Sequence, residues 1–399
     1  METMRGVRLL GIGAFAMGMD AYVMAGLLPG IGGDLGVSAA RAGQAVTVFT
    51  LCYALAAPLL SVALGRLGTR RVLLAALVVF TAANAASALA GSYGTLLSAR
   101  AAAGTGAGLF APTAATAAAA LAPPERRGRA LALVLGGMSG GTVLGVPLGL
   151  LLAAHSGWRA ALWAVSGLGA LALLGVALRL PPVRAAALPS LRGRLRLLSQ
   201  PRVTLVVAVT LTQTVASLGL YTYLGPVLRR TAQVHSPTAY LWAWGIGGVC
   251  GSLLAGAVLD RAGRPARISV ALLGALAAAL AVLPWAGAVP GLVLLPLLVW
   301  GAAGWAFVVP QQHRLLSLEA LGASGGAALA LNSSATYLGG ATGSALGGAA
   351  LAAGLDARWL PLPAAAVAAT GVLLHLGSAC LPSHRGRLSP ATAFERSPL

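Results

Sequence analysis

The segment Gly136–Gly149 reads GGMSGGTVLGVPLG, and from Gly141 onward every fourth residue in it is a glycine. A second apolar segment, residues 339–347, repeats this spacing, and one constant offset separates the matching glycines. The six glycines are Gly141, Gly145, Gly149, Gly339, Gly343 and Gly347. Glycine at every fourth position clears one face of a helix, so that a neighbouring backbone can approach closely. Two such ladders at matching places indicate that the chain consists of two related halves.

The composition is that of a membrane protein. Hydrophobic residues make up 58% of the 399 residues and charged residues only 9%, whereas about 25% of the residues of a soluble domain are charged. The apolar residues fall in runs of roughly 20, the length of helix that crosses about 30 Å of hydrocarbon. Leu and Ala dominate these runs, which favours helices over the alternating strands of a barrel.

We therefore predict an all-α membrane protein with twelve transmembrane helices in two pseudo-symmetric six-helix bundles, an architecture typical of secondary transporters. The predicted spans are 8–30, 42–64, 72–91, 95–121, 129–153, 158–179, 202–227, 238–259, 267–286, 290–311, 322–353 and 358–381. The predicted domains are the N-terminal bundle at 1–180, a cytoplasmic central loop at 181–201, the C-terminal bundle at 202–382 and a disordered cytoplasmic tail at 383–399.

The net charge of +19 rests on arginine alone, because the chain contains no lysine. Of the 27 arginines, 21 fall in loops on the N-terminal side of the predicted spans, 5 fall in loops on the other side, and Arg100 lies inside a span. This imbalance follows the positive-inside rule and places both termini in the cytoplasm. A nucleic-acid-binding protein would gather its basic residues on one surface of a soluble domain. We therefore expect the lipid bilayer, and no nucleic acid, as a partner.

The loops after the second and eighth predicted spans are also alike. Residues 61–71 read SVALGRLGTRR and residues 256–264 read GAVLDRAGR. Both resemble the Gly-x-x-x-Asp-Arg-x-Gly-Arg-Arg loop signature of the major facilitator superfamily, with Gly65 in place of the acidic residue in the first copy. The matching residues are Arg66, Gly68, Arg70, Arg71, Asp260, Arg261, Gly263 and Arg264. The resemblance implies a gating role for these two loops.

Further motifs fit the same family in order along the chain. Asp20 lies in a first span that resembles the family's acidic first-span motif, and Arg100 is followed by three glycines at alternate positions, starting four residues later. Segment 136–149 resembles the signature associated with antiporters. The whole chain thus resembles the twelve-span drug:proton antiporter branch, which includes bacterial chloramphenicol and sugar efflux proteins. That implies the major facilitator fold and proton handling by Arg100. For the first glycine ladder with Pro147 we predict a close, bendable helix contact between the inward-facing and outward-facing conformations, and static close packing is the alternative.

Asp20 is the one acidic residue deep inside a predicted span, since the other seven of the eight lie at termini, in loops or at span ends. A carboxylate near the midplane costs about 2.5–3 kcal/mol even on the lenient scale, so it must face a cavity or a partner. Arg100 lies at a comparable depth, which makes a direct or water-bridged pair geometrically possible. We predict that Asp20 and Arg100 carry proton coupling. The alternatives are a structural Asp held by hydrogen bonds and an Arg that extends to the headgroups.

Polar and aromatic residues inside the spans could line a substrate cavity. We predict Tyr22, Gln213 and Tyr223 as cavity residues, while helix–helix hydrogen bonds and interfacial anchoring are the alternatives for any of them. The other residues of this kind are Asn84, Tyr221, Trp305, Gln311 and Asn332. A single deep acid disfavours multiply cationic substrates, so a neutral or weakly polar compound fits better.

The sequence predicts a proton-coupled efflux transporter, an antiporter that exports a small drug, sugar or secondary metabolite by alternating access. The alternatives are a nutrient importer or facilitator of the same fold, and a membrane-embedded receptor or enzyme. An enzyme enters because residues 137–140 match the Gly-x-Ser-Gly pattern of intramembrane serine proteases, with His375 in a distant span. We expect no metal, no cofactor beyond the driving proton gradient, and a monomer in the inner membrane of a bacterium.

Overall fold

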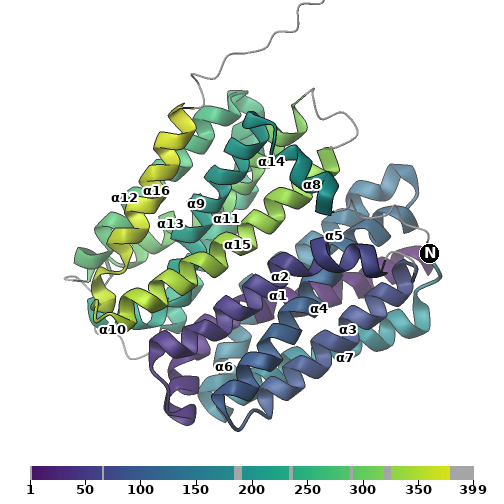
Figure 1. The fold of residues 1–399 in the computed structure, drawn as a ribbon, viewed down its shortest axis with the longest axis horizontal. Coiled ribbons are helices and arrows are strands. Elements are labelled where there is room, and N and C mark those ends of the chain that lie inside the picture. Colours follow the sequence, from purple (N-terminus) through teal and green to yellow (C-terminus); the bar gives the residue numbers. More distant parts are fainter. Residues whose placement is uncertain are drawn as a thin grey trace, which may run out of the picture.

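The computed structural model describes residues 2–64, 67–183, 191–232, 237–287, 291–318 and 325–377, and every regular element within these ranges is a helix. Figure 1 shows two groups of helices that lie side by side, one from the first part of the chain and one from the second. The predicted all-α fold is confirmed. Arg66 and the predicted tail at 383–399 lie outside the described residues.

The first group of helices runs from α1 to α7. Its elements are α1 Glu2–Leu35, α2 Ala39–Leu64, α3 Thr69–Ala88, α4 Tyr93–Leu121, the 3-10 turn η1 Pro124–Arg126, α5 Arg127–Gly140, the π-helical turn η2 Gly141–Gly145, α6 Val146–Ser156 and α7 Trp158–Arg179. We call the face on which α1 begins the N-terminal face, and the face on which it ends the opposite face (Figure 1).

The second group of helices runs from α8 to α16. Its elements are α8 Leu191–Leu197, α9 Pro201–Thr222, α10 Leu224–Ala232, α11 Thr238–Ala262, α12 Pro265–Ala286, α13 Leu294–Ala306, α14 Val308–Leu316, α15 Gly325–Ala352, the 3-10 turn η4 Ala357–Trp359 and α16 Pro361–Gly377. Helix α8 falls inside the predicted central loop. Its Leu197 is buried in a small apolar cluster with Val203 and Leu315, which explains why this segment folds back as a helix.

Ten helical stretches of the described chain are long and apolar enough to cross a membrane. The two predicted spans outside this set are α4 and α15, which are 29 and 28 residues long. Both are rich in Ala, Gly, Ser and Thr, small residues that lower mean hydropathy but allow close helix packing. Accordingly, α4 packs against α2 and α3, and α15 packs against α2 and α9.

Two spans are broken in the middle of a predicted helix, and proline explains both breaks. Proline has no N–H, so it leaves the carbonyl four residues before it without a helical partner. Helix α9 ends at Thr222, four residues before Pro226, and α13 ends at Ala306, four residues before Pro310. Each span then continues as a shorter helix, α10 or α14. The predicted seventh span, 202–227, therefore contains a break at Tyr223.

Each glycine ladder packs against the first membrane-spanning helix of its own half, α1 or α9. A Cβ atom on Gly141 would overlap the carbonyl oxygen of Phe15 in α1, and a Cβ atom on Gly343 would overlap the carbonyl oxygen of Val215 in α9. The two ladders thus make equivalent contacts, as related halves should. They differ in one respect, because the first ladder includes the π-helical turn η2, which ends two residues before Pro147. The second ladder lies in the continuous helix α15.

Candidate functional site

A buried ion pair joins α1 to α4 inside the first half. Nη1 of Arg100 donates to Oδ1 of Asp20 at 2.7 Å, and both residues are fully buried. Asn84 of α3 completes the group, because its amide nitrogen donates to Oδ2 of Asp20 and its carbonyl oxygen accepts from Arg100, each at 3.2 Å. We call these three residues the buried charge cluster. The structure thus realises the direct pair that the sequence allowed and adds Asn84 to it.

The surroundings of Arg100 explain how the protein accommodates its charge. The guanidinium lies over the ring of Phe49 in α2, 4.4 Å from the ring centroid, which is a cation–π contact. A Cβ atom on Gly104, one turn after Arg100, would overlap the carbonyl oxygen of Phe49. The glycine therefore lets α2 come close enough for the ring to cover the charge. Nε of Arg100 is buried, and among the described residues it has no hydrogen-bond partner.

The buried charge cluster can couple proton binding to a change of partners. Protonation of Asp20 would remove the attraction that holds the guanidinium of Arg100 and leave a buried charge without compensation, a state that costs several kcal/mol. The protein can avoid that state only by rearranging α1 against α4 or by supplying another partner. Three helices, α1, α3 and α4, would take part in such a rearrangement.

A group of aromatic rings lies between the two halves. Only Tyr22 comes from the first half, and its ring centroid lies 5.6 Å from Tyr221, 6.0 Å from Trp244 and 6.3 Å from Trp305. Tyr221 and Trp244 are closer still, at 4.3 Å, and Trp300 packs on Trp244 at 6.2 Å. We call these five residues the interface aromatic cluster. It is the place where α1 meets α9, α11 and α13.

Gln213 lies beside this cluster. Its Nε2 donates to the backbone carbonyl of Gly304 at 3.3 Å, and Gly304 directly precedes Trp305. Of the three predicted cavity residues, the structure therefore brings Tyr22 and Gln213 to one region. Trp244 and Trp300 belong to the same region, but their spacing in the sequence does not distinguish them from tryptophans that face lipid.

Tyr223 lies in a different contact, between α2 and α15. It is fully buried, and its hydroxyl donates to the backbone carbonyl of Ser344 at 2.9 Å. A Cβ atom on Gly347 would lie 2.8 Å from the tyrosine ring, and a Cβ atom on Gly43 would overlap it from the first half. Thr47 of α2 also donates to the hydroxyl of Ser344 at 2.9 Å. We call this contact the α2–α15 seam. Within the described chain, no ring contact links Tyr223 to the interface aromatic cluster.

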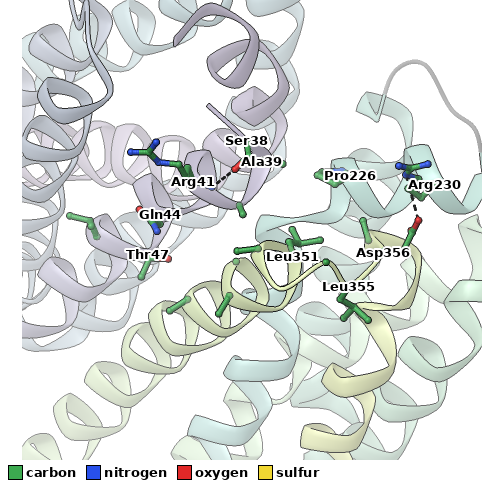
Figure 2. Close-up of a pocket in the computed structure, with 18 residues that line it drawn as sticks. Ser38, Ala39, Arg41, Gln44, Thr47, Pro226, Arg230, Leu351, Leu355 and Asp356 are labelled. Carbon is green, nitrogen blue, oxygen red and sulfur yellow. Dashed lines mark hydrogen bonds and ion pairs between the residues drawn. The ribbon is translucent and has the colours of Figure 1, made fainter. Parts of the chain in front are cut away.

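A cleft of about 1000 Å³ opens next to the seam, on the opposite face. Figure 2 shows its two walls, with Arg41, Gln44 and Thr47 from α2 on one side and Arg230 and Asp356 on the other. Nε of Arg230 lies 3.8 Å from Oδ2 of Asp356, and both side chains are largely exposed. Thr47 belongs both to the seam and to the lining of this cleft, so the seam borders the cleft.

The first signature loop leads from α2 into α3, and one of its arginines links α3 to α7. Gly68 precedes α3 with a positive φ of 76°, which glycine adopts without strain because it has no Cβ atom. Nη2 of Arg70 donates to the carbonyl of Ala177 near the end of α7 at 2.6 Å, whereas Arg71 is exposed. Arg70 thus binds the last turn of α7, whose carbonyl groups lack helical partners.

The second signature loop follows α11 on the same face. Gly263 ends α11 with a φ of 59°, the left-handed conformation of a helix cap. Asp260, Arg261 and Arg264 are all exposed. No ion pair of Asp260 occurs among the residues that the structure describes. The gating role of both loops stays a prediction.

The sequence model of the Major Facilitator Superfamily matches residues 10–344 of the chain. The chain belongs to the major facilitator superfamily. Its predicted fold and family are thereby confirmed, and this major facilitator protein is a multi-pass membrane transporter of small molecules.

Individual relatives agree with this assignment. The inner membrane transport protein YdhP of Escherichia coli (strain K12) is 31% identical over 374 residues, which covers 93% of this chain and 95% of that protein. A chloramphenicol resistance protein of Streptomyces lividans is 37% identical over 267 residues, covering 65% and 67% of the two chains. The crystal structure of the nucleoside transporter NupG superimposes with a TM-score of 0.73 at 13% identity, covering 94% of this chain and 99% of that one.

The serine protease alternative is not supported. Ser139 is exposed on α5 in the first half, whereas His375 lies on α16 in the second half. Nη1 of Arg314 lies 3.0 Å from Nδ1 of His375, so the imidazole is engaged in a contact of its own half. The major facilitator protein is a transporter and not an enzyme.

Proposed function

We propose that this transporter is a proton-coupled exporter of a small, uncharged compound. The observation that supports the proposal most strongly is the buried charge cluster of Asp20, Arg100 and Asn84. A carboxylate that is fully buried in the membrane is costly and marks a functional site such as a proton relay. In this proposal the chain acts as a monomer whose partners are its substrate, protons and the bilayer.

The proposed cycle uses the two protonation states of Asp20. With Asp20 ionised, Arg100 and Asn84 hold α1 against α3 and α4. Protonation from the outside weakens this contact and favours release of the substrate outward. Loss of the proton to the cytoplasm restores the pair. The two conformations must differ in proton affinity, because a ligand shifts an equilibrium only by its differential affinity for the two states.

We further propose that the N-terminal face is cytoplasmic and that the membrane is the inner membrane of a bacterium. The 21 arginines assigned to that side support this orientation. The inner membrane location of the relative YdhP supports the second part. The relative named as a chloramphenicol resistance protein makes chloramphenicol a reasonable first probe for export.

The experiment is proton flux in everted membrane vesicles with an acidified interior. Chloramphenicol, neutral sugars and related compounds are added to vesicles that carry wild type or Asp20→Asn. We expect substrate-induced proton release in wild type and none in Asp20→Asn. The matched control is Asp34→Asn, because Asp34 lies on the same helix but is about half exposed and pairs with Arg159. This control should retain proton release.

Three results bear against the proposal. Proton release that survives in Asp20→Asn would remove coupling from the buried charge cluster. Transport of a probe without any proton movement would indicate a facilitator. Accumulation of substrate against its gradient in right-side-out vesicles or cells would indicate an importer of the same fold.

A further inference from the structure

The interface aromatic cluster contains two hydrogen-bond donors that have no acceptor. The indole nitrogens of Trp244 and Trp305 are buried and have no partner among the described residues. An indole N–H can only donate, so nothing but an acceptor can satisfy it. Buried donors are almost always paired in native proteins, and an unpaired one calls for an explanation.

The third indole of the cluster shows that the protein can satisfy such a donor. The N–H of Trp300 donates to the hydroxyl of Ser217 at 2.8 Å. Trp300 packs on Trp244, as Trp305 does, and it is fully buried. Of the three indole N–H groups of the cluster, therefore, only those of Trp244 and Trp305 lack an acceptor among the described residues. Their rings meet edge to face at 5.6 Å, and a ring is a much weaker acceptor than an oxygen.

The backbone makes room for these rings. A Cβ atom on Gly248, one turn after Trp244, would lie 2.6 Å from the ring of Trp305. The cluster also takes no part in the ion pairs of the described chain, which join Asp20 to Arg100, Asp34 to Arg159 and Arg230 to Asp356. The region thus offers aromatic faces and two N–H groups, but no charge.

We propose that the interface aromatic cluster binds a flat, uncharged substrate with hydrogen-bond acceptors, which accept from the indole N–H groups of Trp244 and Trp305. The substrate ring packs on Tyr22 of the first half and on the tryptophans of the second half. This inference rests on the proposed transport function and names its substrate class. It disfavours sugars and other polyols, which lack a flat apolar face.

The position of the cluster suits alternating access. Tyr22 is its only member from the first half, so movement of the halves separates Tyr22 from three rings at once. A flat ligand can then enter between Tyr22 and these rings, pack on both sides and satisfy both donors. When the halves close again, Tyr22 returns to direct contact with these rings, and the space that holds the ligand is lost. Binding and release thus follow from one relative movement.

The test is equilibrium binding to the purified full-length protein in lipid nanodiscs. Four probes separate the chemical features: chloramphenicol and nitrobenzene have a flat ring with acceptors, ethylbenzene has the ring without acceptors, and mannitol has oxygens without a ring. The variants are Trp244→Phe with Trp305→Phe, which keep aromatic rings but remove both donors. The matched control is Trp285→Phe, an exposed tryptophan that packs on Trp359 outside the cluster.

We expect chloramphenicol and nitrobenzene to bind wild type and the Trp285→Phe control equally. The double variant should bind both about ten-fold more weakly, as the loss of two ordinary hydrogen bonds implies. Ethylbenzene should bind all three proteins alike, and mannitol should bind none. A second variant, Tyr22→Leu, should weaken all three ring-containing probes, because it removes the face that the first half supplies.

Unchanged binding of nitrobenzene to the double variant, or tight binding of mannitol, would overturn the inference. A double variant that does not fold leaves Tyr22→Leu as the decisive protein, and unaltered ring binding by that variant overturns the inference as well. Binding in nanodiscs needs no proton gradient. The inference can therefore fail while Asp20-dependent proton release stands, and it can hold while proton release is absent.

Discussion

Alanine at Gly141 should separate α1 from the span that packs on it. The added Cβ atom would lie 2.8 Å from the backbone nitrogen of Met19 and would overlap the carbonyl oxygen of Phe15. Neither atom belongs to a side chain that can rotate away. Gly140 is the matched control, because a Cβ atom there would meet only the ring of Phe15, at 3.6 Å.

The two substitutions should change stability with opposite sign. Overpacking against a fixed backbone costs roughly 3 kcal/mol, the upper end of the usual range. Alanine gains about 1 kcal/mol over glycine in helix propensity. Gly141→Ala should therefore destabilise the protein by about 2 kcal/mol, whereas Gly140→Ala should stabilise it by up to about 1 kcal/mol.

The assay is the unfolding free energy in mixed detergent micelles, followed by tryptophan fluorescence. The second half provides a replicate, because Gly343 faces the backbone of Val215 while a Cβ atom on Gly340 would lie 3.5 Å from the side chain of Leu218. Equal stability of Gly141→Ala and Gly140→Ala would show that the ladder does not carry the close contact with α1. The reasoning would then be wrong for both halves.

Further predictions concern the buried ion pair, the seam and an exposed ion pair. Arg100→Gln should lower the unfolding free energy by about 3–5 kcal/mol, because it leaves Asp20 buried without its partner. Adding Asp20→Asn should restore part of this loss. If the effects of the two substitutions on the unfolding free energy simply add, the two residues do not form a direct pair. Gly43→Ala should lower the melting temperature. Adding Tyr223→Phe should partly restore it, because the tyrosine hydroxyl is the atom nearest to the added methyl group. If the double variant melts no higher than Gly43→Ala, the added methyl group clashes with other atoms. Asp34→Asn should leave the melting temperature close to that of wild type, because exposed ion pairs contribute little to stability.

The elements of this fold follow from local features of the sequence. Twelve apolar runs predict the spans, and each of the two broken helices ends at a carbonyl that a proline four residues later leaves unpaired. The seventh span was predicted as one helix over 202–227, but Pro226, which explains the break between α9 and α10, is visible in the sequence. The two glycine ladders predict a duplicated chain, because glycine at every fourth position indicates close backbone approach and this spacing occurs at matching places in both halves. Asp20 and Arg100 stand out for a related reason, since charges inside an apolar run are expensive and therefore rare.

Partners across helices could not be predicted in the same way. In a helix that is apolar all round, the sequence does not indicate which face turns toward which neighbour. Asn84 was therefore recognisable as a polar residue but not as the third member of the buried charge cluster. The same holds for Tyr223, which the break after α9 directs into the α2–α15 seam, away from the interface aromatic cluster.

The sequence by itself determined the class of this protein: an all-helical, duplicated membrane protein with one deep acid and one deep base. Hydropathy, helix breakers and glycine spacing act along the chain, so they can be read from it. Only the tertiary structure decided that Asp20 meets Arg100 and Asn84, and that Tyr22 meets three aromatic residues of the second half. Those contacts depend on the rotation and approach of helices far apart in the chain, which packing sets and local sequence does not encode.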